Sequence, residues 1–200
     1  IHKVLFDLGY VNSKEPFKQL LTQGMVLKDG VKMSKSKGNV VCPSDLLQQY
    51  GVDATRLFIC FAAPPEQSIE WSDGGVGGTH RFLSKLWKLV HENLEQFQSE
   101  ALMEEAKKYP QGMQILYQIQ NDFSKIQLNT VVSGIMKMIN WLNDSAQTTG
   151  SKSWFMKQTL MNLYPLAPNI STKLLMLLTN DQLQKCHLIS IEKVWCELDQ

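Results

Sequence analysis

The chain has 200 residues, of which 44% are hydrophobic and 20% are charged, so it can bury one sizeable core and is not expected to be disordered or fibrous. Its 20 basic and 19 acidic residues leave a formal net charge of +1, so phosphate binding would have to come from a local cluster of charge. No apolar run approaches the roughly 18 residues that a membrane-spanning helix needs, and no membrane partner is expected.

The first 78 residues are dense in glycine and proline and predict short elements between tight turns. Helical spacing of apolar residues predicts helices over Lys3–Leu8 and Glu15–Thr22. Residues 24–27 indicate a short buried strand that ends at a turn over residues 28–30.

Two short helices are expected after a lysine-rich segment at residues 32–39, which we call the lysine loop. The first helix opens at Pro43 and stops at Gly51. Asp53 is the expected N-cap of the second helix, which covers Ala54–Ala62. These elements would present the lysine loop.

From Thr79 onward glycine becomes scarce and long segments carry apolar residues at helical spacing. The antiparallel helices expected here are about Thr79–Phe97, Gln111–Gln127, Asn129–Ala146, Lys152–Tyr164 and Pro168–Leu178. The third of them carries an apolar stripe typical of a bundle helix, formed by Leu128, Val131, Val132, Ile135, Met138, Ile139 and Leu142. We therefore expect a mainly α protein with a domain boundary near Gly77, which divides it into residues 1–78 and 79–200.

The cysteines favour a reducing, cytoplasmic compartment. They are widely scattered and include no C-x-x-C pair, which argues against a disulfide framework and a zinc finger. Their positions are Cys42, Cys60, Cys186 and Cys196. Cys186 beside His187 resembles a pair of metal ligands, but no second pair lies nearby, so no protein-bound metal is expected.

The lysine loop carries the most informative chemistry. Lys32, Lys35 and Lys37 lie within six residues, with Ser34 and Ser36 between them, so flexible ammonium and hydroxyl groups converge on one segment. Lysine is a compact charge on a flexible stem, which suits a triphosphate or pyrophosphate whose charge moves during a reaction. The alternative is a solvated lysine-rich turn.

The string at residues 32–36, Lys-Met-Ser-Lys-Ser, resembles the second signature loop of class I aminoacyl-tRNA synthetases. The flanks at residues 15–27 and 61–73 are similar to those of bacterial leucyl-tRNA synthetases. A weaker resemblance to the anticodon-binding-type helical domain of that family continues at residues 128–132 and 165–168.

This resemblance implies that residues 1–78 are the end of a Rossmann-type α/β catalytic domain with stem-contact elements. Residues 79–200 would then be an antiparallel, anticodon-binding-type bundle that binds tRNA. Such a ligase activates leucine with ATP, which enters with Mg²⁺, and transfers the leucyl group to tRNA(Leu). The chain begins with Ile1 and contains neither a His-x-Gly-His string nor an editing domain, so we expect a piece of a longer enzyme that is inactive alone.

The same resemblance implies roles for the residues of the lysine loop. Lys32 and Lys35 would be catalytic and hold the migrating β- and γ-phosphates, with Lys35 the stronger candidate for the transition-state charge. Ser34 and Ser36 would shape the loop, and the backbone of Met33 would lie near the adenine, which completes the ATP-binding set. Met33 is equally consistent with a loop anchor packed on the core.

A second candidate site is a basic stripe formed by Arg81, Lys85 and Lys88. At about 100° per residue these side chains share one face of the predicted Thr79–Phe97 helix. The opposite face carries Leu83, Leu86, Val90, Leu94 and Phe97. Leucyl-tRNA synthetases that resemble this chain use basic residues at the positions of Arg81 and Lys85 to contact the tRNA backbone, so we predict tRNA binding; the alternative is a solvated helical face.

Two other classes of protein remain open at this point. One is a stand-alone helical RNA-binding module without catalysis. The other is a small nucleotide-binding protein that uses the lysine loop by itself. A His-x-Gly-His motif several hundred residues upstream in the parent reading frame would select the synthetase.

Overall fold

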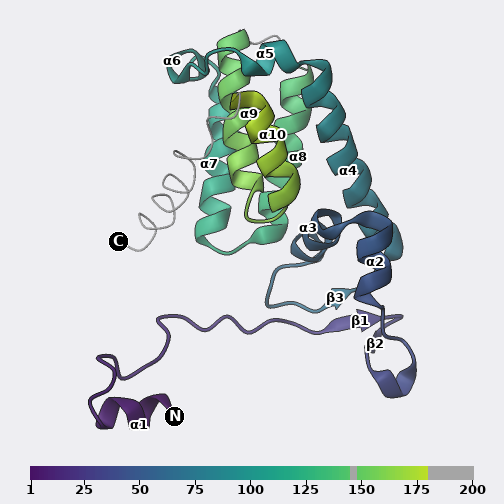
Figure 1. Ribbon diagram of the computed structural model, residues 1–200, viewed down its shortest axis with the longest axis vertical. Coiled ribbons are helices and arrows are strands. Elements are labelled where there is room, and N and C mark those ends of the chain that lie inside the picture. Colours follow the sequence, from purple (N-terminus) through teal and green to yellow (C-terminus); the bar gives the residue numbers. More distant parts are fainter. Residues whose placement is uncertain (145–147, 180–200) are drawn as a thin grey trace.

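The computed structural model describes residues 1–144 and 148–179, and over these ranges the protein is mainly α-helical, as predicted (Figure 1). The helices are α1 (His2–Asp7), α2 (Pro43–Tyr50), α3 (Val52–Ala62), α4 (Asp73–Glu92), α5 (Leu94–Gln98), α6 (Met103–Ala106), α7 (Pro110–Ser124), α8 (Leu128–Asp144), α9 (Thr149–Leu163) and α10 (Pro168–Thr179). The strands are β1 (Val26–Lys28), β2 (Val31–Lys32) and β3 (Ile69–Glu70), and a short 3₁₀ turn, η1, covers Lys35–Lys37.

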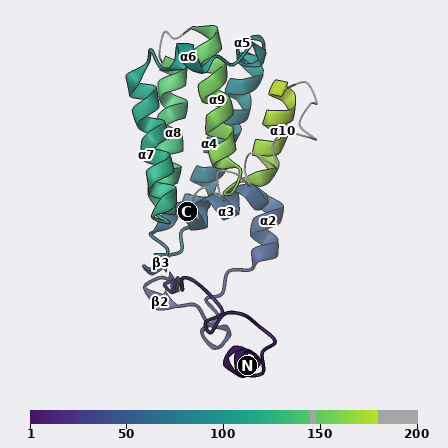
Figure 2. The same ribbon diagram turned by 90° about the vertical axis from the view of Figure 1, so that its left-hand side faces the viewer.

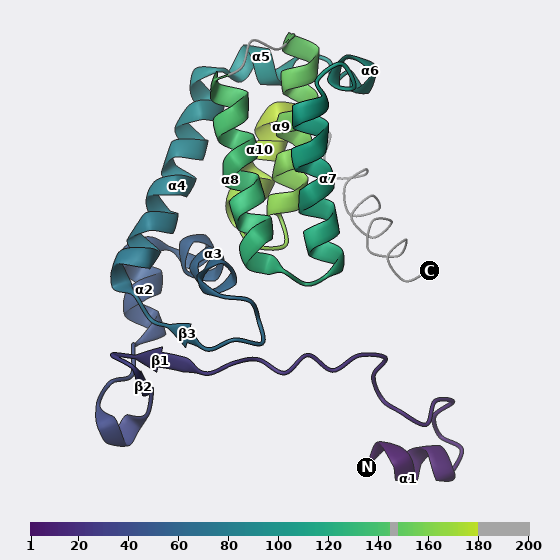
Figure 3. The same cartoon turned by 180° about the vertical axis from the view of Figure 1, so that it is seen from behind.

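The core of the molecule lies in a bundle in which α7, α8 and α9 run side by side, α10 packs against α9, and α4 packs against α3 and α10 (Figure 3). The predicted stripe on α8 is confirmed, since its members other than the half-buried Leu128 are almost fully shielded from solvent. Because α8 packs against α3, α7 and α9, this stripe lies at the centre of the core.

Helix α3 also belongs to this core. Its residues Ala54 and Leu57 are buried in the same hydrophobic cluster as the residues of α8 and α9. The glycine run that marked the expected boundary lies within α4, whose first turn is capped by Ser72, because the Ser72 side chain accepts a hydrogen bond from Gly75 N at 3.2 Å. The division of the chain near Gly77 stays a prediction.

The N-terminal segment extends away from the bundle and ends in α1, as Figure 2 shows. The predicted helix over Lys3–Leu8 is confirmed as α1, but the helix predicted over Glu15–Thr22 is wrong, because this segment is extended. Phe17 and Leu20 are 74% and 82% exposed, so no apolar face is buried here, and propensity alone does not hold so short a helix.

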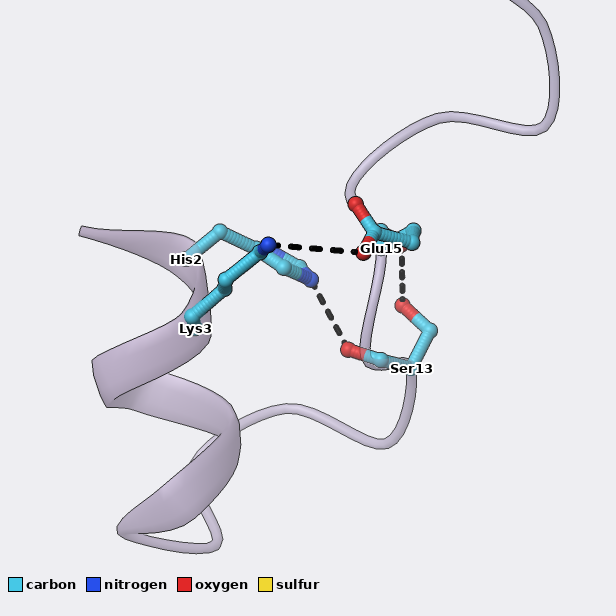
Figure 4. Close-up of polar contacts among 4 residues, drawn as sticks. All are labelled: His2, Lys3, Ser13 and Glu15. Atoms are coloured by element: carbon cyan, nitrogen blue, oxygen red, sulfur yellow. Dashed lines mark hydrogen bonds and ion pairs between the residues drawn. The ribbon is translucent and has the colours of Figure 1, made fainter.

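Polar contacts connect α1 to the segment that follows it (Figure 4). His2 Nε2 lies 2.8 Å from the carbonyl oxygen of Ser13, and Lys3 Nζ forms an exposed ion pair with Glu15 at 3.7 Å. Glu15, expected in a helix, therefore pairs with α1 instead.

The three strands form a small sheet in the order β2-β1-β3. Strands β1 and β2 form an antiparallel hairpin whose turn, Asp29-Gly30, has positive φ at both residues, which is the geometry of a two-residue hairpin loop. The predicted turn is confirmed, but the strand begins at Val26, two residues later than predicted, and is partly exposed. Strand β3 pairs with β1 in parallel.

Three further expectations differ from the structure. The N-cap of α3 is Gly51, with φ of 82°, and Asp53 lies inside the first turn. The predicted Thr79–Phe97 helix is divided at Asn93 into α4 and α5. Helix α7 ends at Ser124, whereas the predicted helix extends to Gln127. It ends earlier because Ile126 has a φ of 56°, outside the helical region.

Helices α8, α9 and α10 begin and end close to their predicted bounds, although residues 145–147 lie outside the described ranges.

No helix in the described ranges has the length and apolarity needed to cross a membrane. Within the same ranges, no group of three or more His, Cys, Asp or Glu side chains is arranged so that it could hold a metal ion.

Cys42 is an exposed free thiol, and Cys60 is a partly buried one. Burial raises the pKa of the Cys60 thiol, although the positive charge of Arg56 acts in the opposite direction. Cys186, His187 and Cys196 lie outside the described residues.

Candidate functional site

The lysine loop leaves the β1–β2 hairpin at Lys32 and projects away from the bundle (Figure 1). After Ser34 the backbone tightens into η1, which ends at Gly38 with φ of 65°, a conformation that favours glycine. Lys32, Lys35 and Lys37 are all exposed. The structure therefore places the three exposed lysines on the end of β2 and on the short turn that follows it.

Asn39 organises this turn. Its Oδ1 atom accepts a hydrogen bond from Ser34 N at 2.9 Å, and its Nδ2 group donates to the carbonyl oxygens of Val31 and Lys32 at 3.4 and 3.3 Å. One side chain thus closes the loop onto strand β2. The sequence carries no signal for this role of Asn39, because only the folded loop places its side chain opposite these backbone groups.

The cations of the lysine loop have no acidic partner among the described ion pairs, which involve Lys3, Lys88 and Lys107. Ser34 and Ser36 lie with their hydroxyl oxygens 3.2 Å apart. This turn offers exposed positive charge and hydroxyl groups to an anion, which is the chemistry expected of a phosphate-binding loop.

Met33 anchors the loop to β1, because its backbone N–H donates to the carbonyl oxygen of Val26 at 3.3 Å and its side chain is half-buried. This bond attaches Met33 to the sheet, but Met33 is not among the described residues of the hydrophobic core, so its packing on the core stays a prediction. Contact of its backbone with adenine stays a prediction.

Strand β3 and the residue after it connect the hairpin to the bundle. Glu70 accepts a hydrogen bond from Gly30 N at 3.0 Å, and Trp71 N donates to the carbonyl oxygen of Leu27 at 2.7 Å. The Trp71 ring packs edge-on against Phe58 of α3, with ring centroids 5.2 Å apart. In the sequence, residues 61–73 show only the family resemblance, and none of these contacts can be predicted from them.

The basic stripe lies on α4 as predicted. Arg81, Lys85 and Lys88 are exposed, and the facing residues Leu83, Leu86 and Val90 are buried. Lys88 pairs with Glu92 across one helical turn at 3.6 Å. Arg81 and Lys85 have no partner among the described ion pairs, so they are the stronger phosphate-binding candidates of the three.

The lysine loop and the start of α4 lie toward the same end of the molecule (Figure 1). Helix α4 begins beside α2, at the end of the bundle that faces the loop, and runs away from it (Figures 1 and 3). An open cavity of about 620 Å³ lies between α2, α3, α4 and α10, and its lining includes Tyr50, His80, Trp87 and Lys173. The loop lysines and the basic stripe do not line this cavity.

Comparison with known proteins identifies relatives of this arrangement. A family model described as tRNA synthetases class I (I, L, M and V) matches residues 4–72. A leucine–tRNA ligase from Coxiella burnetii is 45% identical over 186 residues, which cover 86% of this chain and 23% of the ligase. A leucine–tRNA ligase from Legionella pneumophila is 44% identical over 190 residues, which cover 84% of this chain and 23% of the ligase.

Solved structures have the same fold. A leucyl-tRNA synthetase (LeuRS) of Agrobacterium radiobacter, in a ternary complex with tRNA and LeuAMS, matches 88% of this chain and 25% of its own with a TM-score of 0.80 and 29% identity. Methionyl-tRNA synthetase of Mycobacterium tuberculosis, in complex with methionyl-adenylate, matches 84% of this chain and 40% of its own with a TM-score of 0.60. At 19% identity the second likeness shows the fold alone.

The resemblance noted in the sequence is confirmed by these relatives. The chain spans about a quarter of their length, and the shared stretch includes both the lysine loop and the helical bundle. The chain belongs to the leucine–tRNA ligases, a family of class I tRNA synthetases.

Proposed function

We propose that this chain is the part of a leucine–tRNA ligase that supplies the ATP-phosphate loop and a tRNA-binding helical domain. The observation that carries the proposal is the lysine loop, where three exposed lysines without described acidic partners lie on a turn closed by Asn39. The 45% identity to a leucine–tRNA ligase supports the reaction that we propose for this turn. A cytoplasmic location stays a prediction.

In the proposed first step, an oxygen of the leucine carboxylate forms a bond to the α-phosphorus of ATP. The bond from that phosphorus to the bridging oxygen breaks, and pyrophosphate leaves with the electron pair and with the Mg²⁺ that accompanied ATP as substrate. The ammonium groups of Lys32 and Lys35 bind the β- and γ-phosphates and stabilise the charge that develops on them. Ser34 and Ser36 hold the shape of the turn.

In the proposed second step, a terminal hydroxyl of tRNA(Leu) attacks the carbonyl carbon of leucyl-adenylate. The bond from that carbon to the phosphate oxygen breaks, the hydroxyl proton passes to the phosphate, and AMP leaves. The contribution of this chain is to hold the tRNA. Arg81 and Lys85, with a smaller contribution from the ion-paired Lys88, contact backbone phosphates along α4. Contacts of this kind fix the orientation of the tRNA and do not read its bases.

A full-length ligase that contains this stretch should catalyse leucine-dependent exchange of labelled pyrophosphate into ATP, and the purified 200-residue chain should not. The physical reason is that one half of a site cannot supply the geometry that adenylate formation needs. Exchange above background by the chain alone would contradict the proposed division of the site. Tight RNA binding by the chain, without leucine-dependent exchange in the full-length protein, would instead favour the helical RNA-binding module.

Changing both Arg81 and Lys85 to alanine in the full-length ligase should weaken tRNA binding while leucine activation is preserved. With each phosphate contact that is lost, tRNA binding releases fewer counterions. The slope of log affinity against log salt should therefore become shallower by roughly 0.7 to 0.9 units per contact. Helix α4 should persist, since both side chains are exposed and alanine favours helix. Titrations with tRNA at several salt concentrations, run beside pyrophosphate exchange, measure both effects.

The matched control replaces Lys125 and Lys137, two exposed lysines outside α4, by alanine. It changes the net charge equally and should leave the salt dependence of tRNA binding unchanged. An equal loss of tRNA affinity in both double variants would show that the basic stripe is only a solvated helical face.

A further inference from the structure

The open cavity between α2, α3, α4 and α10 is part of neither candidate site described above. Its volume of about 620 Å³ lies within the range of roughly 300–1,000 Å³ that is usual for ligand pockets. We call it the α4 groove, because α4 contributes more than one turn to its lining, with His80, Leu83, Ser84 and Trp87. The groove is therefore large enough for a planar ring system.

Trp87 gives the α4 groove an accessible aromatic surface. Its side chain is 41% exposed, and its ring packs on that of His91, one helical turn further along α4, with centroids 4.3 Å apart. His91 does not line the groove, so it braces the indole from outside while another part of the indole borders the groove. A ring that is already held in place loses little conformational freedom when a flat ligand stacks on it.

Tyr50 and His80 form a second pair of rings in the lining, where α2 meets α4. Their rings meet edge-on with centroids 6.0 Å apart, and His80 Nδ1 lies 3.1 Å from the carbonyl oxygen of Tyr50. A carbonyl oxygen only accepts, so Nδ1 carries the hydrogen in this contact. The other ring nitrogen, Nε2, has no partner among the described hydrogen bonds and is available to a ligand.

The charged groups of the lining favour an anion. Lys173 of α10 is exposed and takes part in none of the described ion pairs. Asp53 also lines the groove, but its two oxygens accept hydrogen bonds from Asn169 Nδ2 at 2.9 Å and from Ile170 N at 2.7 Å. The acidic group is therefore engaged within the protein, and the ammonium group is free to bind.

The α4 groove adjoins the basic stripe. At about 100° per residue, His80, Ser84 and Trp87 lie along one line of α4, roughly a quarter-turn around the helix from the basic stripe. Both lines are exposed and cover the same stretch of the helix. A nucleic acid whose phosphates lie on the basic stripe therefore passes beside the opening of the groove.

We propose that the α4 groove binds one unpaired nucleotide of the tRNA whose backbone lies on the basic stripe. This inference rests on the proposed function. The base stacks on Trp87, and a phosphate next to it pairs with Lys173. Aromatic rings beside cations hold single-stranded nucleic acid, because every base has a flat face and every nucleotide a charge. The cations on α10 and α4 favour such an occupant over a protein segment.

Removing the ring and removing the cation should have different effects on tRNA binding. Trp87→Ala should weaken tRNA binding on the order of tenfold, as expected for the loss of one stacked base. It removes no charge, so the slope of log affinity against log salt should stay the same. Lys173→Ala should make this slope shallower by roughly 0.7 to 0.9 units, because one phosphate contact is lost. Trp87→Phe keeps a ring and should recover most of the affinity.

The test uses these three variants in the full-length ligase. Tyr117→Ala is the matched control, since it removes an aromatic side chain that is 73% exposed on α7, away from the groove. Titrations with tRNA at several salt concentrations give the affinity and its slope. Dimethyl sulfate and a carbodiimide, which modify unpaired bases, report which bases of the bound tRNA are protected. Pyrophosphate exchange, which needs no tRNA, shows whether each variant is folded.

The proposal predicts that an unpaired base is protected by the unmodified ligase and by Trp87→Phe, and that Trp87→Ala loses both this protection and affinity at an unchanged slope. Unchanged affinity and protection in Trp87→Ala would overturn it, as would an equal loss of affinity in Tyr117→Ala. A shallower slope in Trp87→Ala would also overturn it, because the variant would then have disturbed the basic stripe. An unmodified ligase without leucine-dependent exchange would instead overturn the proposed function.

Discussion

Replacing Lys35 by alanine in the full-length ligase is expected to slow leucyl-adenylate formation on the order of 10²-fold, comparable with the loss of one transition-state donor in other enzymes. Lys35 is exposed on η1 and has no acidic partner among the described ion pairs, so its charge is available to the departing phosphates. Because that charge develops as the phosphorus–oxygen bond breaks, the rate should fall much more than the affinity for ATP. Stopped-flow or exchange kinetics at varied ATP concentration separate the two.

Lys37→Ala is the matched control, since it removes the same charge from the other end of η1. It should reduce the rate of adenylate formation much less than Lys35→Ala, because no phosphate contact is assigned to it. A raised Michaelis constant for ATP with an unchanged rate in Lys35→Ala would make Lys35 a ground-state binder. The transition-state role would then pass to Lys32.

Phe155→Ala is expected to destabilise the 200-residue chain by about 3–5 kcal/mol, the usual cost of removing a fully buried phenylalanine. Phe155 on α9 is fully buried and packs edge-on against Trp141 and Trp154, with ring centroids 5.0 and 5.1 Å away. Its removal leaves a cavity that these rigid rings cannot fill. Urea denaturation followed by far-ultraviolet circular dichroism measures the loss without depending on tryptophan fluorescence.

Tyr117→Ala gives the control for this measurement. Tyr117 is an exposed aromatic residue on α7, so its removal should change the free energy of unfolding by no more than about 0.5 kcal/mol. Similar losses in both variants would show that Phe155 does not lie in a tightly packed core. A small loss in Phe155→Ala alone would mean that the surrounding helices collapse onto the vacated volume.

Sequence patterns that depend on near neighbours predicted much of this protein correctly. Apolar spacing located the buried stripe of α8 and the two faces of α4, because the helical period places such residues on one side wherever the helix packs. The turn over residues 28–30 was predicted from its turn-forming residues, and Asp29 and Gly30 both have positive φ in the structure. The string at residues 32–36 indicated the family that the relatives then confirmed.

Expectations failed where the outcome depended on a distant part of the chain. The predicted helix over Glu15–Thr22 had suitable local spacing, yet no surface of the described chain covers Phe17 and Leu20, so nothing stabilises a helix there. Asp53 looks like the cap of the helix that it opens. Its acceptors are instead used by Asn169 and Ile170, more than 100 positions away in the sequence.

The sequence by itself determined the period of the bundle helices, the hairpin turn and the lysine string, because each depends on residues a few positions apart. Only the tertiary structure decided that Asn39 closes the lysine loop, that Trp71 connects the sheet to α3, and that Asp53 on α3 caps α10. The physical reason is that a hydrogen bond forms with whichever partner the fold brings within about 3 Å. That partner can lie anywhere along the chain, so local sequence patterns do not predict it.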